Sequence, residues 1–272
     1  MTGMAPQVAS PQLSDADFRV IQQMMEGASG IRLSAAKRYL VVNRLARRLR
    51  RYGLSRFRDY LERVRQDPDE HRIMVDLLTT NETWFFREPR HFEVLAQVAR
   101  SHAGKLRVWS AASSSGEEAY SAAMTLAENR GSSSWEIVGT DISSSVLSMA
   151  REGIYPMRLA DSIPSALLHR YCLKGIGQHD GDFCIKESLR QHINFQPLNL
   201  CEPTPMTLGQ FDVVFLRNVL IYFEREKKQD IVSNVLSRMP VGGLLMIAHA
   251  ESLFSYKLPV KAVAPSIYRK TA

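Results

Sequence analysis

The sequence has 272 residues, of which 45% are hydrophobic and 23% are charged, a composition that suits one α/β domain with a small companion domain. No apolar run reaches the roughly 18 residues needed to cross a bilayer, and the N-terminus lacks the basic-then-apolar pattern of a secretory signal. The three cysteines show no C-x-x-C spacing, which argues against a metal site or a disulfide framework. We therefore expect a cytoplasmic protein that does not insert into a membrane.

The N-terminal part of the chain is predicted to be helical. Residues 1–13 are rich in Pro, Ser and Gln, and we expect them to be flexible. Residues 14–80 have apolar side chains at helical spacing, which predicts a small all-α domain. Ser14 is expected to cap its first helix, Gly53 to end another, and the segment at 67–69 to break the chain before a last helix that starts near Glu70.

This helical region carries most of the positive charge. The chain has a formal net charge of +7, and residues 32–65 contain 12 basic against 2 acidic residues. Arginines in the predicted helix at 37–52 lie on a broad arc away from its apolar face. Such a face is either solvated surface or a binding surface for an anionic partner: nucleic acid, a membrane or an acidic protein. The arginines that we expect on this arc are Arg44, Arg47, Arg50 and Arg51.

From residue 106 onward strands alternate with helices, which predicts βαβ units and a mostly parallel sheet. The strands are expected at residues 106–111, 135–142, 211–217 and 244–248, and the helices at 117–129, 143–152 and 224–239. Between about 155 and 194 short segments and three glycines interrupt this alternation. We interpret this stretch as a small insertion of antiparallel strands.

The first strand leads into a turn of small residues and then into a helix that opens with Glu117 and Glu118. Ligands of open α/β sheets bind at the carboxyl ends of the strands, and small residues let the backbone approach them closely. Two acids at a helix N-terminus would repel a pyrophosphate. A nucleotide without phosphates that bears a positive charge, such as S-adenosylmethionine, fits better. The alternative is a loop whose acids only match the helix dipole.

Three further segments carry candidate ligand groups. Asp141 ends the second strand, where an acid can accept hydrogen bonds from ribose hydroxyls, although it could equally cap the next helix. The segment at 79–88 combines three aromatic residues with polar side chains, and residues 216–223 follow the third strand at the same edge of the sheet. Either segment could also serve only as core and turn caps.

Together, four sequence segments resemble the chemotaxis receptor-glutamate O-methyltransferases, the CheR family. They are TTNETWFFRE (79–88), SGEEAYS (115–121), GTDIS (139–143) and FDVVFLRNVLIYF (211–223). The resemblance covers essentially the whole chain past Ser14. It implies a Rossmann-like class I S-adenosylmethionine methyltransferase domain at 106–272 with an antiparallel β insertion, preceded by the all-α domain and a cofactor-contacting linker at 81–105. As departures, Glu82 and Trp84 fill variable positions, and Ser115 stands where Thr is frequent.

Carried over residue by residue, the resemblance implies a cofactor site and a catalytic pair. The cofactor-binding residues are Asn81, Thr83, Arg87, Glu118, Asp141, Asn199, Leu200, Arg217 and Asn218. Arg87 and Tyr222 match positions beside the transferred methyl group, and no metal is expected. The reaction implied is methylation of glutamate side chains on chemotaxis receptors, giving methyl esters and S-adenosylhomocysteine, for sensory adaptation.

The implied partners are the cytoplasmic domains of chemotaxis receptors, whose acidic helices would bind the arginine face. In some members of the family a C-terminal receptor peptide docks at the insertion, and the loop at 175–181 resembles the longer, glycine-rich version of those members. We expect a monomer and no nucleic-acid partner.

The chemistry of such a reaction makes few demands on the protein. A glutamate carboxylate is ionised at pH 7 and a sulfonium is a good leaving group, so neither a general base nor a metal is required. The protein then has only to align the carboxylate oxygen with the methyl carbon and the sulfur, and to exclude water. His249 and Glu251, after the fourth strand, are interpreted as structural. Two alternatives stay open: a nucleic-acid methyltransferase, disfavoured by the lack of an N-P-P-Y/F motif or catalytic Cys, and a cofactor-binding sensor, disfavoured by Arg87 and Tyr222.

Overall fold

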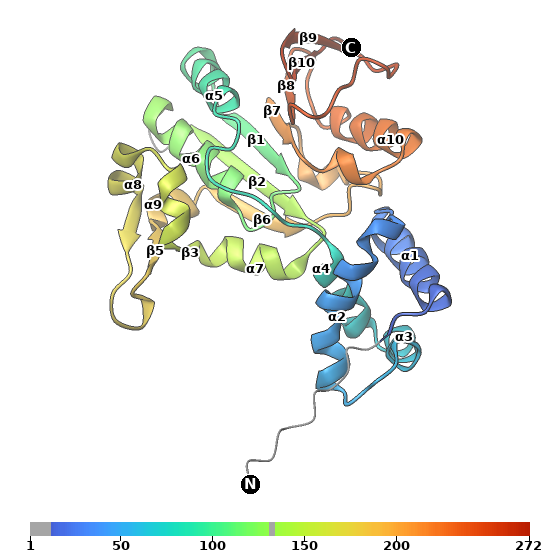
Figure 1. Ribbon diagram of the computed structural model, residues 1–272. Coiled ribbons are helices and arrows are strands. Elements are labelled where there is room, and N and C mark those ends of the chain that lie inside the picture. Colours follow the sequence, from blue (N-terminus) through green and yellow to red (C-terminus); the bar gives the residue numbers. More distant parts are fainter. Residues whose placement is uncertain (1–11, 131–133) are drawn as a thin grey trace. The chain divides into compact units, whose positions relative to one another are not determined.

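The computed structural model describes residues 12–130 and 134–272, and the chain divides into two compact units, Met1–Thr80 and Asn81–Ala272 (Figure 1). Of the flexible segment expected at 1–13, residues 1–11 lie outside the described residues, whereas Leu13 is buried in the core of the helical unit. Within the described part of the chain no helix has the length and apolar character needed to span a membrane.

The first unit is all-helical, as expected. Ser14 caps its first helix, accepting a hydrogen bond from the Asp17 amide at 3.1 Å. The break expected at 67–69 lies at Asp67, which is extended between two helices and is the N-cap of the last one. That helix begins at Pro68 rather than near Glu70, because a missing N–H costs nothing at the first helical position. The elements are α1 (Asp15–Ser29), η1 (Ala35–Lys37), α2 (Arg38–Arg51), α3 (Phe57–Gln66) and α4 (Pro68–Leu78).

The core of the helical unit comes from apolar residues at helical spacing. Val41, Leu45 and Leu49 are fully buried and lie every fourth residue along α2, where they face Phe57 and Met74 in one cluster. The opposite side of α2 carries the exposed arginines. The sequence pattern alone therefore fixes which face of this helix is covered.

The second unit contains a seven-stranded sheet in the order β6-β2-β1-β7-β8-β10-β9. The pairs from β6 through β8 are parallel, and β8–β10 and β10–β9 are antiparallel. The strands are β1 (Leu106–Ala111), β2 (Trp135–Asp141), β6 (Ile193–Pro197), β7 (Val213–Leu216), β8 (Leu244–Ile247), β9 (Val260–Ala264) and β10 (Ile267–Lys270). The order reverses direction at β1, which is where ligands of such sheets bind.

Central strands of this sheet are apolar along their whole length. All four residues of β7 are fully buried, because a parallel strand covered on both faces has no solvent side. This is why β1, β2, β7 and β8 were predictable from the sequence. The sequence pattern did not predict β6, β9 or β10, whose residues are largely half-buried or exposed.

The predicted insertion is a separate three-stranded antiparallel sheet in the order β3-β5-β4. In Figure 1 it stands apart from the large sheet, beside helices α8 and α9. Its last predicted residues, 193 and 194, belong to β6 of the large sheet. The elements are β3 (Ile154–Pro156), η2 (Met157–Ser162), α8 (Ser165–Tyr171), β4 (Cys172–Lys174), η3 (Gly177–His179), β5 (Asp182–Ile185) and α9 (Glu187–Arg190).

The remaining helices complete the second unit. Helix α5 (Arg90–Ser101) lies in the segment that the sequence marked only as a linker, and it packs along α6. The others are α6 (Glu117–Arg130), α7 (Ser144–Glu152) and α10 (Arg225–Leu236), with the short 3₁₀ turns η4 (Met206–Leu208) and η5 (Leu220–Tyr222). These elements place the loops after β1, β2, β6, β7 and β8 at one edge of the sheet.

Candidate active site

The loop between β1 and α6 has a tightly determined backbone. Ala112 and Ser114 have positive φ angles of 66° and 50°, and Gly116 has 97°. Non-glycine residues in this region are strained and persist where surrounding contacts hold them. Here the Ser113 amide donates to the Thr140 carbonyl at 2.8 Å, and the Ser114 amide to Asp141 Oδ2 at 2.9 Å. The loop is thus held against the end of β2.

Asp141 lies where the sequence placed it, at the end of β2. Its side chain is buried, and besides Ser114 it accepts the Ser143 amide at 3.0 Å. The carbonyl of Asp141 also accepts the amide of Leu198 at 3.0 Å, which brings the loop after β6 alongside. Asn199 and Leu200 follow directly in that loop. The sheet therefore brings three of the predicted cofactor residues together.

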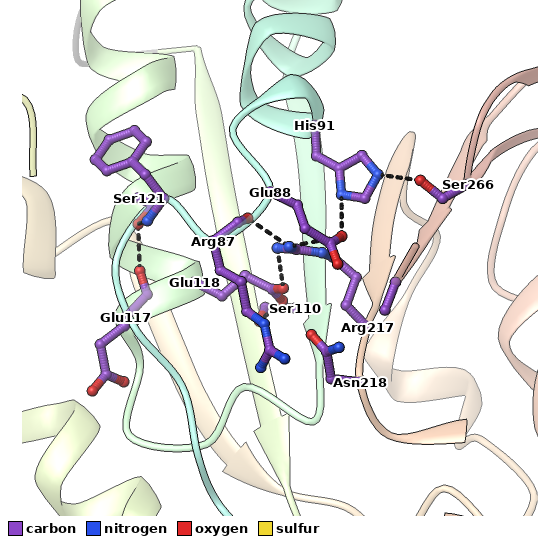
Figure 2. Close-up of polar contacts among 12 residues, drawn as sticks. Arg87, Glu88, His91, Ser110, Glu117, Glu118, Ser121, Arg217, Asn218 and Ser266 are labelled. Atoms are coloured by element: carbon purple, nitrogen blue, oxygen red, sulfur yellow. Dashed lines mark hydrogen bonds and ion pairs between the residues drawn. The ribbon is translucent and has the colours of Figure 1, made fainter. Parts of the chain in front are cut away.

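A buried ion-pair cluster joins the ends of β1 and β7 (Figure 2). Arg217 Nη1 is 2.9 Å from Glu118 Oε2, and Arg217 Nη2 is 3.1 Å from Glu88 Oε2. Glu118 Oε1 accepts the Ser110 hydroxyl at 2.7 Å. Burial raises the pKa of the Glu118 carboxyl in spite of Arg217, whereas Arg217 and the His249 amide outweigh burial and lower the pKa of Glu88. Two carboxylates thus share one guanidinium.

The segment before α5 carries Arg87 on a strained backbone. Its neighbours Phe86 and Glu88 have positive φ angles of 52° and 55°. The Phe86 amide donates to Ser121 Oγ at 2.9 Å, and the Arg87 carbonyl accepts Arg217 Nη2 at 2.5 Å (Figure 2). The Arg87 guanidinium lies over the Trp84 ring, 4.1 Å from its centroid. Hydrogen bonds to Ser121 and Arg217 therefore hold the backbone of this segment, while the Arg87 side chain stays half-buried.

Two other predicted cofactor residues precede Arg87. The Asn81 carbonyl accepts the Ser114 hydroxyl at 2.9 Å, so this segment lies against the loop after β1. Thr83 is half-buried between Asn81 and Arg87. The segment at 81–88 is thereby brought to the same edge of the sheet as Asp141 and Glu118.

The loop after β7 is held by a residue that the sequence did not assign to the site. Glu251 accepts the amides of Ala248 at 2.9 Å, Asn218 at 3.3 Å and Ile221 at 3.3 Å. Asn218 has a positive φ of 57°, and Tyr222 ends the short turn that follows. Glu251 therefore positions the loop that carries Asn218 and Tyr222. The sequence offered one sign of this role, because Glu251 follows β8, the strand that pairs with β7.

The arginines of the helical unit divide into two kinds. Arg44 Nη1 donates to the carbonyls of Leu77 at 3.2 Å and Thr79 at 2.5 Å, so this side chain is half-buried at the end of α4. The other three, Arg47, Arg50 and Arg51, are exposed. The exposed charge of the predicted binding face therefore comes from these three arginines, because Arg44 is bound to the carbonyls at the end of α4.

The sequence matches models of a known family over both units. Residues 81–268 match the CheR methyltransferase, SAM binding domain, and residues 16–79 match the CheR methyltransferase, all-alpha domain. The chain belongs to the CheR methyltransferase family. This confirms the predicted family, the predicted fold class, methyltransferase activity and S-adenosylmethionine as the cofactor.

Two chemotaxis protein methyltransferases are similar to this chain over most of its length. The chain is 42% identical to a chemotaxis protein methyltransferase of Escherichia coli (strain K12) over 88% of this chain and 85% of that protein. It is 37% identical to chemotaxis protein methyltransferase 2 of Pseudomonas aeruginosa over 93% and 92%. A solved O-methyltransferase family protein from Burkholderia thailandensis is 15% identical over 68% of this chain and 42% of its own, with a TM-score of 0.35.

The side chains at this edge of the CheR domain suit the cofactor chemically. S-adenosylmethionine bears an ammonium, a sulfonium, a carboxylate and two ribose hydroxyls. Glu118 in the first turn of α6 and Asp141 at the end of β2 are acids placed where cationic and hydroxyl groups are expected, and Arg87 supplies positive charge for a carboxylate. The donor set therefore fits, and the assignment of each residue to a part of the cofactor remains a prediction.

Proposed function

We propose that this enzyme esterifies glutamate side chains on the cytoplasmic domains of chemotaxis receptors, and that the residues converging at the ends of β1, β2 and β7 form its active site. The observation that carries the proposal is the convergence of Glu118, Asp141 and Arg217 in a CheR chain. These groups come from segments up to a hundred residues apart, yet they share one edge of the sheet. The products would be glutamate methyl esters and S-adenosylhomocysteine.

Arg87 and Tyr222 are proposed as the catalytic residues. When bound, S-adenosylmethionine supplies a methyl group activated by its sulfonium. The substrate carboxylate is already ionised, so the protein has to orient it and exclude water. Arg87 can attract the carboxylate, while its stacking on Trp84 limits how tightly it binds the oxygens. Tyr222 can donate a hydrogen bond that fixes the direction of attack.

The exposed arginines of α2 are proposed to hold the receptor. Arg47, Arg50 and Arg51 lie on the solvent side of a helix whose other face is buried. A cationic helix face attracts a helical bundle rich in Glu through long-range electrostatics and so raises the rate of encounter. Arg44 was predicted to belong to this surface, and we propose for it a supporting role at the end of α4.

The small sheet is proposed as the docking site for a C-terminal receptor peptide. Strand β5 lies between β3 and β4, so both outer strands have a free edge within the sheet. Leu173 in β4 is 55% exposed, and Ile176, which follows that strand, is 82% exposed. An extended peptide can add to such an edge with main-chain hydrogen bonds and cover these apolar side chains. Tethering would raise the effective concentration of receptor helices to about millimolar.

The docking proposal is tested by titrating the protein with C-terminal peptides of the chemoreceptors from its own host. We expect micromolar binding that is lost when residues 175–181 are shortened and kept in an Ile154→Ala control. If no peptide binds while receptor methylation is intact, the enzyme works without a tether. We further propose monomeric action in the cytoplasm, which sedimentation and fractionation can check.

Methylation of receptor-containing membranes with tritiated S-adenosylmethionine tests the main proposal. Carboxyl esters release tritiated methanol in mild base, and mapping then identifies the modified glutamates. Base-stable label on nucleic acid would identify a nucleic-acid methyltransferase instead. Cofactor binding without any transfer would identify a sensor module.

A further inference from the structure

Three side chains of types that ligate metals lie together, and one of them, Glu88, pairs with Arg217 beside Glu118. Glu88 and His91 stand where the chain enters α5, and His249 follows β8; one ligand atom from each lies within 4.8 Å of the others. Glu88 Oε2 is 3.5 Å from His91 Nδ1, and Glu88 Oε1 is 4.0 Å from His249 Nδ1. Neighbouring ligands in a tetrahedral zinc site lie about 3.4 Å apart, so only small movements are needed.

The buried histidine of this cluster directs an unpaired nitrogen into it. His91 is fully buried, and its Nε2 is 2.8 Å from Ser266 Oγ (Figure 2). Ser266 Oγ itself donates to the Pro265 carbonyl at 2.6 Å, so the hydrogen in the first contact comes from His91 Nε2. Nδ1 then carries a lone pair, faces the Glu88 carboxylate and has no hydrogen-bond partner among the described residues. A cation bound between the His91 Nδ1 lone pair and the Glu88 carboxylate would stabilise both acceptors.

The charges around the cluster also favour a cation. Glu88 and Glu118 share the single guanidinium of Arg217, which leaves one negative charge in excess. Contact between Arg217 and Glu88 is of the kind that orients ligating carboxylates in metal sites.

We propose that Glu88, His91 and His249 form a binding site for one divalent transition-metal ion, with Zn²⁺ as the best match. Two imidazoles and one carboxylate suit zinc, whereas Mg²⁺ and Ca²⁺ prefer all-oxygen ligands. The His249 side chain is 53% exposed, so an ion can reach the cluster from solvent. The ion is not needed for methyl transfer, for which no metal was expected. It would tie the segment before α5 to the end of β8.

Titration of the untagged, metal-stripped full-length protein with Co²⁺ tests this proposal. We expect the visible absorption of tetrahedral Co²⁺ to saturate at one equivalent and to disappear when Zn²⁺ is added. His249→Ala should weaken the binding of Co²⁺ by about tenfold or more. This side chain is partly exposed, so the fold should survive, which circular dichroism can check. His91→Gln, if folded, should have the same effect on binding.

His102→Ala is the matched control, because this partly exposed histidine lies 3.9 Å from Asp212 outside the cluster. Its Co²⁺ affinity should equal that of the unmodified protein. Absence of the tetrahedral spectrum at stoichiometric Co²⁺ would overturn the proposal. Equal affinities in His249→Ala and the unmodified protein, equal losses in both alanine variants, or an intense thiolate charge-transfer band would overturn it as well.

Discussion

Each unit of the protein buries an arginine–glutamate cluster, and the two clusters differ in how completely their polar atoms are paired. In the helical unit the carboxylate of Glu70 is buried and accepts hydrogen bonds from Tyr60 at 2.7 Å, Tyr52 at 2.8 Å and Arg48 Nε at 2.9 Å, with a further bond from Arg48 Nη2. One carboxylate therefore receives four bonds. The cluster ties α2 to α3 and α4.

The cluster of the methyltransferase unit is under-paired by comparison. Arg217 is shared by Glu88 and Glu118, and among the described side chains Arg217 Nε and His91 Nδ1 are buried without a hydrogen bond. A fully paired buried network stabilises and specifies a fold, whereas unpaired buried groups need a further reason for being there. We therefore expect the fully paired cluster to stabilise the fold, and we propose that the incompletely paired cluster serves ligand binding.

The largest effect is expected when the saturated cluster loses its carboxylate. Glu70→Ala removes the carboxylate that pairs with Arg48 and accepts the Tyr52 and Tyr60 hydroxyls, so the free energy of unfolding of the helical unit should fall by about 3–5 kcal/mol. All three tryptophans lie in the second unit, so far-ultraviolet circular dichroism should detect an earlier transition that tryptophan fluorescence does not. Asp69→Ala, at an exposed neighbour, is the control. Coincident unchanged transitions would show that the network contributes no stability.

The same cluster should respond to acid. Burial raises the pKa of Glu70, but hydrogen bonds from Arg48, Tyr60 and Tyr52 outweigh it and lower the pKa to about 2. Because the folded pKa lies below the unfolded one, the stabilisation is present above about pH 4.5 and lost as the pH falls toward 2. The loss should approach about 3 kcal/mol. Glu70→Gln should flatten this part of the stability curve, and an unchanged curve would exclude Glu70 as its source.

Substitutions of the two acids of the proposed cofactor site should weaken cofactor binding more than they destabilise the fold. Glu118→Gln and Asp141→Asn should each weaken S-adenosylmethionine binding by about 1–3 kcal/mol, because each removes a charge-assisted hydrogen bond. Isothermal titration calorimetry measures the affinity, and denaturation measures the fold. Glu128→Gln, at an acid farther along α6, is the control and should bind normally. Normal affinity in both site variants would remove the cofactor from this edge of the sheet.

A smaller effect is expected at the arginine face. Reversing Arg47, Arg50 and Arg51 to Glu should raise the apparent KM for receptor by about tenfold and flatten its dependence on salt, with cofactor affinity unchanged. An equal charge change at Arg58, Arg65 and Arg72 on α3 and α4 is the control. If both triple variants behave alike, only net charge matters and α2 is not a specific surface.

The smallest effect is expected at Tyr222. Tyr222→Phe removes one hydroxyl and should lower kcat several-fold with little change in KM or in cofactor affinity, since its hydrogen bond is proposed to strengthen during methyl transfer. Single-turnover kinetics at saturating receptor measure this. Tyr39→Phe, at an exposed tyrosine of α2, is the control. Full activity of Tyr222→Phe would leave the hydroxyl without a role.

The sequence by itself determined the elements whose chemistry is local. Val42, Leu45, Leu49 and Tyr52 predicted an apolar face for α2, and the structure buries Leu45 and Leu49 of this set together with Val41. The strand predicted at 211–217 contains the fully buried β7. The order of four motifs indicated the CheR family, its fold and its cofactor. These inferences succeeded because helical spacing, continuous burial and strand-end motifs each leave a signal within a few residues.

Features that depend on contacts between distant parts of the chain could be recognised only from the tertiary structure. The edge strand β6 and the hairpin β9–β10 have no continuous apolar pattern, so pairing defines them rather than composition. The sequence predicted Arg44 to be an exposed surface charge, but in the fold its guanidinium donates a hydrogen bond to a carbonyl at the end of α4. Glu251 and the Glu88–His91 pair acquired roles only when segments distant in the chain met. The physical reason is that a hydrogen bond needs atoms about 3 Å apart, and sequence spacing does not specify that distance across the fold.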